Sequence, residues 1–260
     1  WNQTEKDWRL LVENPLNICL LAEFDNKVIG TSTAINYSNE VAWVAMVLVD
    51  KEYRGKGVSR VLLKEMFRRT ECCRIVKLDA TPSGQQVYKD FGFEIEYGIN
   101  RMENLSLTKT VSSDNMIITQ PVRLTDLQEI IAFDKIVFGV KRSQLIEHLI
   151  RSFPQKAWML KQNNRLTGFV LGREGSRFHH IGPVMAETNR DAKILITKCF
   201  IELFGKPVII DVLDDKKNLI QWLSSLGFTQ QRQFFRMYKR ENPYPGVIVN
   251  QYSICGPEFG

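Results

Sequence analysis

Apolar residues form two kinds of run in the first third of this chain. Val41 to Val49 is an unbroken apolar run, which is typical of a strand covered on both faces. After a polar turn, apolar residues recur at helical spacing with charged residues between them. These apolar residues are Val58, Val61, Leu62 and Met66. The pattern therefore predicts a central strand, a turn and an amphipathic helix that begins near Val58.

The turn between this strand and helix is basic and contains two glycines, with the sequence DKEYRGKGVS. Gly55 and Gly57 allow the backbone to approach a ligand closely. The first N–H groups of the helix have no intrahelical partner and lie at the positive end of the helix dipole, so they favour a phosphate. The sequence predicts an anion-binding turn here. The alternative is an ordinary turn on which Arg54 and Lys56 are merely solvated.

A second strand and a short helix follow this unit. Residues 74–81 (RIVKLDAT) predict the strand, and Ser83 with Gln86 predicts a capping box at the start of the helix. Gly92 is expected to end the helix in a left-handed conformation. Tyr88 then lies one helical turn before that glycine.

Together these features resemble the GNAT superfamily of acyl-CoA N-acyltransferases. The turn matches the pyrophosphate-loop pattern Q/R-x-x-G-x-G/A at Arg54, Gly57 and Ser59, where Ser59 is a mild departure from Gly or Ala. Tyr88 and Gly92 match the Tyr-x-x-x-Gly-Phe ending of that family. Neither the P-loop pattern GxxxxGK[ST] nor the dinucleotide pattern GxGxxG fits this turn. The resemblance implies an α/β (α+β) fold, with a mixed, mostly antiparallel sheet flanked by helices.

The resemblance also implies acetyl-CoA as the co-substrate, no metal, and a set of site residues. A strand N–H near Val47 or Leu48 is expected to bind the thioester carbonyl, and Tyr88 to protonate the departing thiolate. Thr81 stands where many relatives have Asn. The alternative for Tyr88 is a packed side chain whose hydroxyl bonds to backbone. The expected coenzyme-binding residues are Val47, Leu48, Val49, Arg54, Gly55, Lys56, Gly57, Val58, Ser59, Arg60 and Thr81.

An acceptor amine also needs to lose a proton, because an alkyl amine has a pKa of about 10.4. Relatives often place a Glu on the fourth strand for this purpose, but residues 43–49 hold no acidic residue. Glu40, at the strand start, and Asp79, on the next strand, are the candidates for the general base. We prefer Asp79, because strand-end residues beside the splay face the substrate cleft; the alternative is that Asp79 caps the turn at Thr81.

The second half of the chain repeats the landmarks of the first. NKVIG at 26–30 resembles NRLTG at 164–168, and both copies end in Arg-Met, ten residues after Gly92 and Gly227. This spacing predicts two GNAT folds in tandem. We expect a first domain at 1–104 with the acetyl-CoA site, a polar linker at 105–115, and a second domain at 116–260 on which the C-terminal tail (256–260) packs.

The second copy differs where the chemistry is expected. RDAKIL at 190–195 replaces RGKGVS, so both glycines are lost and Asp191 brings negative charge toward a diphosphate. Leu223 takes the place of Tyr88. The second domain is therefore predicted to be a degenerate one that scaffolds, shapes the substrate site or binds something else.

About 20 residues before the first hairpin of the second copy have no counterpart in the first copy, and the chain does not begin with Met. They include Ile117 to Gln120 and a helix from Leu124. We expect the first strand and part of the first helix of copy one to lie outside this sequence.

Composition limits the cellular location and the kinds of partner that this protein is expected to have. No run of 18 apolar residues and no signal-peptide pattern is present, so a cytoplasmic protein without a membrane partner is expected. Five cysteines without metal-type spacing favour a reducing compartment. The net charge of +6 is spread among 29 acidic residues without a long basic run, which argues against a nucleic-acid partner. His179 and His180 are neighbours on a predicted strand and point to opposite faces, which argues against a shared metal.

The sequence thus predicts an acetyl-CoA-dependent N-acetyltransferase that moves an acetyl group to a primary amine of a small molecule or peptide by direct attack. The alternatives are a transferase for another acyl group and a non-catalytic acyl-CoA sensor or interaction module. Trp1, Trp8 and Trp43 either line an aromatic wall for a flat or cationic amine or pack in the core.

Overall fold

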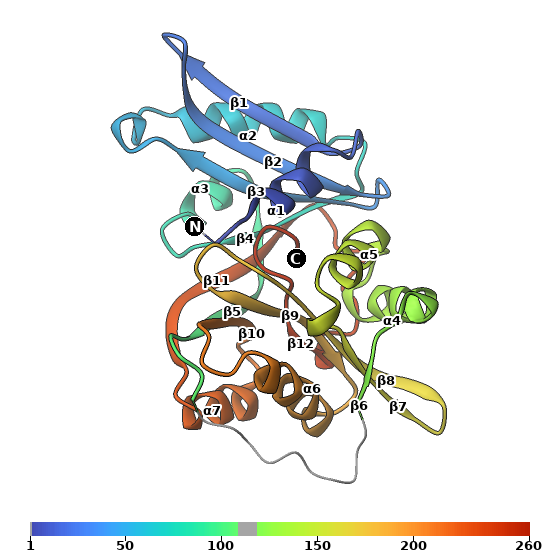
Figure 1. The fold of residues 1–260 in the computed structure, drawn as a ribbon. Helices are drawn as coiled ribbons and strands as arrows, with labels where there is room; N and C mark the ends of the chain where they lie inside the picture. Colours follow the sequence, from blue (N-terminus) through green and yellow to red (C-terminus); the bar gives the residue numbers. More distant parts are fainter. Residues whose placement is uncertain (1, 109–118) are drawn as a thin grey trace. The chain divides into compact units, whose positions relative to one another are not determined.

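The computed structural model describes residues 2–108 and 119–260 (Figure 1). Contacts divide these residues into two compact units. The N-unit comprises 5–96, 235–243 and 257–260, and the C-unit comprises the described residues of 1–4, 97–234 and 244–256. Of the expected linker at 105–115, residues 109–115 lie outside the described residues, as do Trp1, Ile117 and Ile118. The boundary predicted near residue 104 therefore stays a prediction.

The N-unit is built on a mixed sheet in the order β1-β2-β3-β4-β11. The pairs β1–β2, β2–β3 and β4–β11 are antiparallel, whereas β3 and β4 are parallel and are joined through α2. Leu62, Leu63 and Met66 bury one face of α2 in the core of this unit. Its elements are α1 (Glu5–Val12), β1 (Ile18–Phe24), β2 (Lys27–Tyr37), β3 (Val41–Val49), η1 (Lys51–Tyr53), α2 (Val58–Arg69), β4 (Ile75–Ala80) and α3 (Gln85–Asp90).

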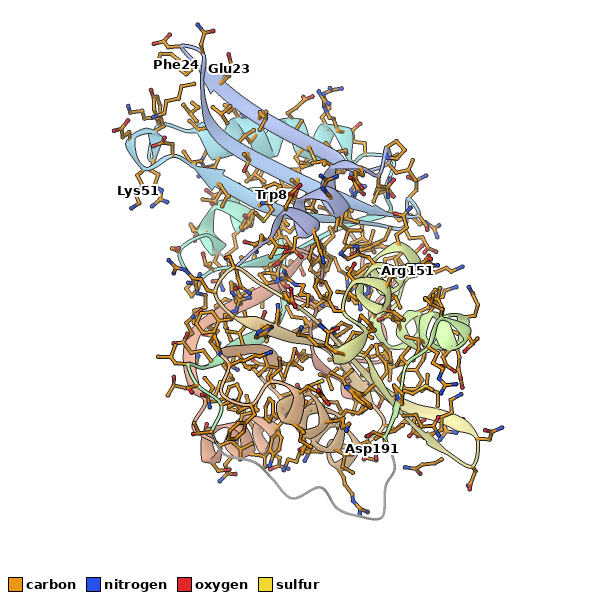
Figure 2. All side chains as sticks on the ribbon, viewed as in Figure 1. Trp8, Glu23, Phe24, Lys51, Arg151 and Asp191 are labelled. Atoms are coloured by element: carbon orange, nitrogen blue, oxygen red, sulfur yellow. The ribbon has the colours of Figure 1, made fainter. Side chains whose placement is uncertain are left out.

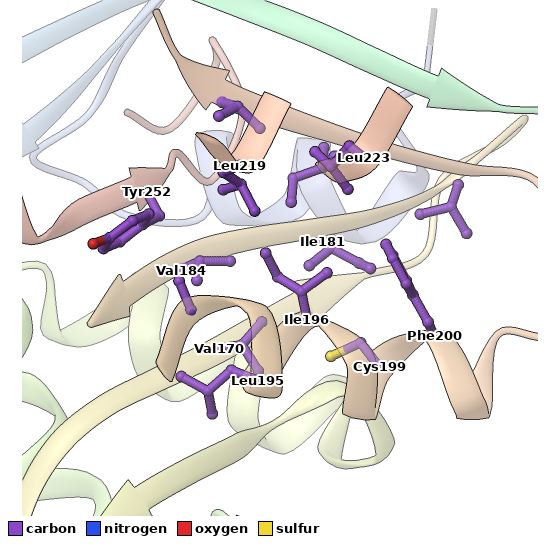
Figure 3. Packing of buried hydrophobic residues seen from close by; sticks show 14 of the residues in the cluster. Val170, Ile181, Val184, Leu195, Ile196, Cys199, Phe200, Leu219, Leu223 and Tyr252 are labelled. Carbon is purple, nitrogen blue, oxygen red and sulfur yellow. The ribbon is translucent and has the colours of Figure 1, made fainter. Parts of the chain in front are cut away.

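The C-unit repeats this plan with strands in the order β11-β5-β10-β12-β9-β8-β7-β6. Helices α6 and α7 pack their apolar faces on a fully buried cluster, part of which Figure 3 shows. The elements are β5 (Glu94–Asn104), β6 (Thr119–Pro121), η2 (Leu124–Asp126), α4 (Leu127–Phe138), α5 (Ser143–Ser152), η3 (Pro154–Lys156), β7 (Trp158–Gln162), β8 (Arg165–Arg173), β9 (His179–Ala186), α6 (Asn189–Glu202), β10 (Val208–Leu213), α7 (Lys217–Ser225), β11 (Thr229–Lys239), η4 (Ile248–Asn250) and β12 (Gln251–Ser253). The predicted fold class is confirmed.

Two strands pass from one unit into the other. β5 begins in the N-unit and ends in the C-unit, and β11 runs the opposite way. As a result, Arg101 of the first repeat lies opposite Asp211 of the second, and Arg236 of the second lies opposite Asp79 of the first. The Arg-Met pair that ends each repeat therefore pairs with a strand from the other half of the sequence.

The C-terminal tail departs from its expected place. We expected residues 256–260 to pack on the second domain, but Pro257–Gly260 belong to the N-unit. Trp43 Nε1 donates a hydrogen bond to the Pro257 carbonyl at 3.0 Å, and the Tyr37 hydroxyl donates one to the Phe259 carbonyl at 2.8 Å. Two buried polar groups on β2 and β3 thus find their partners in the tail, which is why the tail is held there.

None of the helices among the described residues has the combined length and apolar character that a membrane span requires.

Candidate active site

The end of β3 is an irregular strand that loses its partner. β3 pairs in parallel with β4 only from Val41 to Trp43, where Trp43 lies opposite Lys77. Its register with β2 shifts farther along, and Met46 has a positive φ of 50° there. An extra residue of this kind bends a strand and increases its twist. In the described residues, the edge of β3 that faces β4 is therefore unpaired from residue 44 to residue 49.

The turn that follows β3 presents an uncapped helix N-terminus. Gly57 is the N-cap of α2, has a φ of 82°, and provides no side chain to bond the free N–H groups. Gly55 has a φ of 75°, and a Cβ added to either glycine would meet nothing within 4 Å. Lys51 lies at the start of this turn (Figure 2). The predicted anion-binding geometry is thus present: the backbone is open and the helix dipole is not neutralised by a side chain.

The basic side chains at this turn differ in how they are engaged. The Arg54 Nε donates to the Val49 carbonyl at 3.2 Å, and Arg60 forms an ion pair with Asp90 at the end of α3. Lys56 stacks on the Tyr53 ring at 4.9 Å and has no acidic partner among the described side chains. Lys56, like Lys51 and Arg54 of the same turn, forms no ion pair with a described acidic side chain.

Tyr88 lies on α3, and its side chain packs against the core that β3, β4 and α2 share. Its ring contacts Phe93 edge-on at a centroid distance of 6.0 Å. Within the described chain its hydroxyl has no hydrogen-bond partner, which does not fit the alternative of a packed tyrosine satisfied by backbone. Burial raises the pKa of Tyr88 to about 12, because desolvation disfavours the phenolate. The hydroxyl is therefore a protonated donor without a protein acceptor.

Asp79 lies on β4 in a fully buried ion pair. Its two carboxylate oxygens accept hydrogen bonds from Arg236 Nε and Nη2 at 2.9 and 3.0 Å. The Arg236 guanidinium in turn stacks on the Trp43 ring at 4.5 Å. Protonation of the carboxylate would break this pair, so the geometry does not suit the general base that we expected. We propose instead that Asp79 holds Arg236 and β11 in place.

Glu40 does not suit that role either. It lies in the turn before β3, where its carbonyl accepts a hydrogen bond from the Ile75 N–H. The unpaired end of β3 near Leu48 is eight residues farther on, which is about 26 Å at the rise of an extended strand. Tyr88, Val47 of the β3 edge and Val58 at the start of α2 thus pack against one core cluster, while Asp79 is paired with Arg236 and Glu40 lies at the other end of β3.

The start of α3 also differs from its prediction. The expected capping box between Ser83 and Gln86 is wrong, because α3 begins after Gly84 and has no side-chain cap. Ser83 instead bonds to Thr81 at 3.1 Å, and Gln86 donates to Asp90 at 2.8 Å. The Thr81 carbonyl accepts from the first N–H groups of the helix. The predicted stop at Gly92 is confirmed, since its φ is 82°.

Two features of the site escaped the sequence. Nothing in the apolar run of β3 signals the positive φ of Met46. In the sequence, only the repeated Arg-Met pair distinguishes Arg236, and that repetition is the available signal of a paired, buried arginine.

The equivalent helix of the C-unit is closed at its N-terminus. Thr188 caps α6, with its hydroxyl oxygen accepting from the Asp191 N–H at 3.1 Å and its hydroxyl donating to the Asp191 carboxylate at 2.8 Å. Asp191, labelled in Figure 2, is 2% exposed. A capped N-terminus with a buried carboxylate does not suit a phosphate, which agrees with a degenerate second domain.

Of the two adjacent histidines, His180 lies in the C-unit core and His179 is half-buried. His180 is fully buried with Nε2 at 3.2 Å from Asp211, while its Nδ1 lies 3.2 Å from Arg173. Burial lowers the pKa of His180, although Asp211 opposes that shift. The part of the chain that the structure describes holds no cluster of three or more His, Cys, Asp or Glu arranged for a metal ion.

Two known proteins are similar to this chain in sequence. Holothin acyltransferase of Pseudoalteromonas sp. (strain SANK 73390) is 24% identical over 224 residues, which cover 86% of this chain and 75% of the relative. The uncharacterized N-acetyltransferase YitH of Bacillus subtilis (strain 168) is 25% identical over 185 residues, which cover 71% of this chain and 65% of the relative.

Solved structures show the same architecture. A Pyrococcus horikoshii protein assigned as an acetyltransferase superposes with a TM-score of 0.79 at 23% identity, covering 98% of this chain and 84% of that one. A tandem GNAT protein from the clavulanic acid biosynthesis pathway superposes with a TM-score of 0.61 at 12% identity, covering 93% and 89%.

Two family models decide the family. One for an acetyltransferase (GNAT) domain matches residues 15–95, and a second with the same description matches residues 130–253. These two stretches contain the first uncapped turn and its closed counterpart, and together they span most of the chain. The chain therefore belongs to the GNAT acetyltransferases and is an acyltransferase with two GNAT domains in tandem.

Proposed function

We propose that the first domain is an acetyl-CoA-dependent N-acetyltransferase that acetylates a primary amine of a small molecule or peptide. The observation that carries this proposal is the grouping in the N-unit of an uncapped helix N-terminus, an unpaired strand edge and a tyrosine hydroxyl without a partner. The helix N-terminus suits a diphosphate, and the strand edge suits a pantetheine arm that pairs with the backbone. The tyrosine hydroxyl suits a leaving thiolate. Enzymes of this family use an acyl-CoA and an acceptor substrate.

In the proposed reaction the chain binds the diphosphate of acetyl-CoA and polarises its thioester carbonyl. The thioester itself is the activated acyl donor. The N–H groups after Gly57 and the charge of Lys56 hold the diphosphate, and N–H groups at Val47 or Leu48 bind the thioester carbonyl oxygen. The amine nitrogen bonds to the acyl carbon and releases one proton to solvent, the carbon–sulfur bond breaks, the sulfur takes a proton from Tyr88, and solvent returns a proton to Tyr88. A positioned acid of this kind typically contributes roughly 10²- to 10⁴-fold.

The proton of the acceptor ammonium leaves to solvent in this proposal. Asp79 is committed to Arg236, and Glu40 lies at the far end of β3. No side chain is therefore assigned as the general base, and the acceptor reacts as the free amine.

The experiment measures thiol release from acetyl-CoA in the presence of polyamines, amino acids, aminoglycosides and lysine peptides. We expect one amine class to drive release, and the Tyr88→Phe variant to lose about 100-fold or more in kcat with an unchanged dissociation constant for acetyl-CoA. The matched control is Tyr53→Phe, which keeps the ring on which Lys56 stacks. Unchanged turnover in Tyr88→Phe would refute the acid role.

The same assay separates the alternatives. Release from longer acyl-CoA donors, but not from acetyl-CoA, would establish a transferase for another acyl group. Binding of acyl-CoA with no release for any donor or amine would favour the sensor, and would count against the proposed enzyme.

A further inference from the structure

The last strand of the chain lies inside the C-unit sheet. β12 pairs antiparallel with β9, with Gln251 opposite Met185 and Ser253 opposite Val184. On its other side Ser253 lies opposite Val212 of β10. β9 and β10 pair directly in parallel only from His179 to Ile181, and β12 separates them after that point.

The repeat identifies the equivalent place in the N-unit. Gly30 and Gly168 end the repeated motif and lie opposite Val49 and Ala186 of the following strands. Counting back from these two residues, Val184 and Met185 correspond to Val47 and Leu48. β12 therefore pairs with β9 at the positions where the first domain has its unpaired strand edge.

The other neighbour of β12 gives the same equivalence. Val76 of β4 lies opposite Ala42, and Val208 of β10 lies opposite His179, which corresponds to Ala42 in the same count. Ala80 of β4 thus corresponds to Val212 of β10, the partner of Ser253. The gap between two parallel strands, which the first domain leaves open, holds a peptide in the second.

The peptide is fixed at this position by burial and hydrogen bonds. Gln251, Ser253 and Ile254 are at most 2% exposed, and Ile254 N–H donates to the Asp211 carbonyl at 3.0 Å. Tyr252 lies in the buried cluster of α6, α7 and β9, where Leu219 and Leu223 also lie (Figure 3). Leu223 is the residue that replaces Tyr88.

Gly182 of β9 makes room for this segment. A Cβ built on Gly182 would overlap the carbonyl oxygen of Ile254. The corresponding residue of β3, by the same count, is Ala45, which carries a Cβ. The C-unit strand is therefore shaped to accept a peptide backbone at this point.

We propose that β12 is a resident intramolecular ligand of the second domain, which takes an extended peptide where the first domain takes its acyl-CoA. The part of this statement that concerns acyl-CoA rests on the proposed function. Strand pairing on both sides supplies the main-chain hydrogen bonds of a peptide-recognition site. With the position between β9 and β10 filled by β12 and the N-terminus of α6 capped by Thr188, the second domain binds no coenzyme, and each chain binds one.

Hydrogen exchange on the full chain tests residence of the peptide. We expect the amides of residues 251–254 to exchange at least about 100-fold more slowly than in an unstructured peptide. Saturating acetyl-CoA is expected to slow exchange at residues 54–61 and to leave residues 251–254 unchanged. Fast exchange at 251–254, or acceleration there by acetyl-CoA, would overturn the proposal. Absence of any effect at 54–61 would instead count against the proposed function.

Two glycine variants separate displacement of the peptide from backbone strain. Gly182→Ala is expected to raise exchange at 251–254 at least about tenfold. Gly205→Ala is the matched control, because Gly205 also has a positive φ, of 74°, but a Cβ there meets nothing within 4 Å. It should leave exchange at 251–254 as in the unmodified chain. Equal effects of the two variants would contradict the proposal.

Tyr252→Ala supplies a second variant in case Gly182→Ala does not fold. It removes the buried Tyr252 side chain and is expected to raise the exchange rate at 251–254 while the amides of β8 stay protected.

A separate experiment, native mass spectrometry of the unmodified chain, counts the bound acetyl-CoA molecules. One coenzyme per unmodified chain supports the proposal, and two would overturn it.

Discussion

At the scale of single residues, the N-unit separates two roles that the sequence had assigned to neighbouring elements. The Tyr88 hydroxyl has no hydrogen-bond partner among the described residues, whereas the Asp79 carboxylate forms an ion pair with Arg236. A side chain is available for proton transfer only if its polar atoms are not already held in a strong hydrogen bond or ion pair. In the proposed reaction Tyr88 is therefore the proton donor, and Asp79 has the structural role that we propose for it.

The raised pKa of Tyr88 predicts the pH dependence of the reaction. Tyr88 donates only when protonated, and with its pKa raised to about 12 it loses this proton only as the pH rises through that value. The acceptor amine, with a pKa of about 10.4, reacts only when deprotonated. We expect log kcat/KM to rise with a slope near one from about pH 7 to 9 without a falling limb below about pH 10. A fall between pH 8 and 9 in a protein that stays folded would contradict this prediction.

The Asp79–Arg236 pair predicts a large loss of stability when it is broken. Arg236→Ala leaves a buried carboxylate without its bidentate partner, which typically costs about 3–5 kcal/mol of unfolding free energy. Arg68→Ala is the control, because its ion pair with Glu65 lies on an exposed face, where solvent screens the charges and the pair contributes little to stability. Urea unfolding followed by circular dichroism measures both. Equal effects of the two variants would argue against a structural role for Arg236.

At the scale of elements, the two repeats use the same strand–turn–helix unit in opposite ways. α2 starts from a glycine without a side-chain cap, whereas α6 starts from Thr188, which caps it. An open N-terminus attracts an anion, and a capped one has already used its free N–H groups. One local substitution pattern thus separates an uncapped helix N-terminus from a capped one.

Gly57→Ala tests the open helix end. A non-glycine residue at a φ of 82° costs about 1–2 kcal/mol, so the variant is expected to prefer another turn conformation. Binding acetyl-CoA must then restore the original turn, which predicts a dissociation constant weaker by about tenfold. Gly205→Ala is strained in the same way but lies outside the turn, and its affinity should be unchanged. Calorimetric titration measures both, and an unchanged affinity in Gly57→Ala would count against the turn as the coenzyme site.

At the scale of the whole molecule, the exchange of β5 and β11 links the stabilities of the two units. Each unit contains a strand segment whose other part belongs to the other unit. Within each unit, a pair such as Arg236–Asp79 or Arg101–Asp211 joins strands from the two halves of the sequence. The chain is therefore expected to behave as one cooperative folding unit.

Scanning calorimetry tests this expectation. We predict a single transition whose calorimetric and van't Hoff enthalpies agree. The control is Arg236→Ala, which should lower the midpoint of that single transition without splitting it. Two separate transitions in the unmodified chain would show that the units unfold independently.

The sequence by itself determined the repeat, the strand–turn–helix unit at Val41 to Arg69, the basic glycine turn and the stop at Gly92. These features depend on periodicity and on residues close together in the chain, so local rules suffice to predict them. The same rules gave a wrong prediction at Ser83. The capping box does not form, because α3 begins after Gly84 and the Thr81 carbonyl accepts the N–H groups of Gly84 and Gln85.

Only the tertiary structure decided which groups meet. The partner of Asp79 is 157 residues away and that of Asp211 is 110 residues away. The positive φ of Met46, the place of Pro257–Gly260 in the N-unit and the insertion of β12 likewise depend on pairing between distant strands. Such pairings are selected by the burial and hydrogen bonding of the completed sheet, because no single segment carries the energy that fixes them.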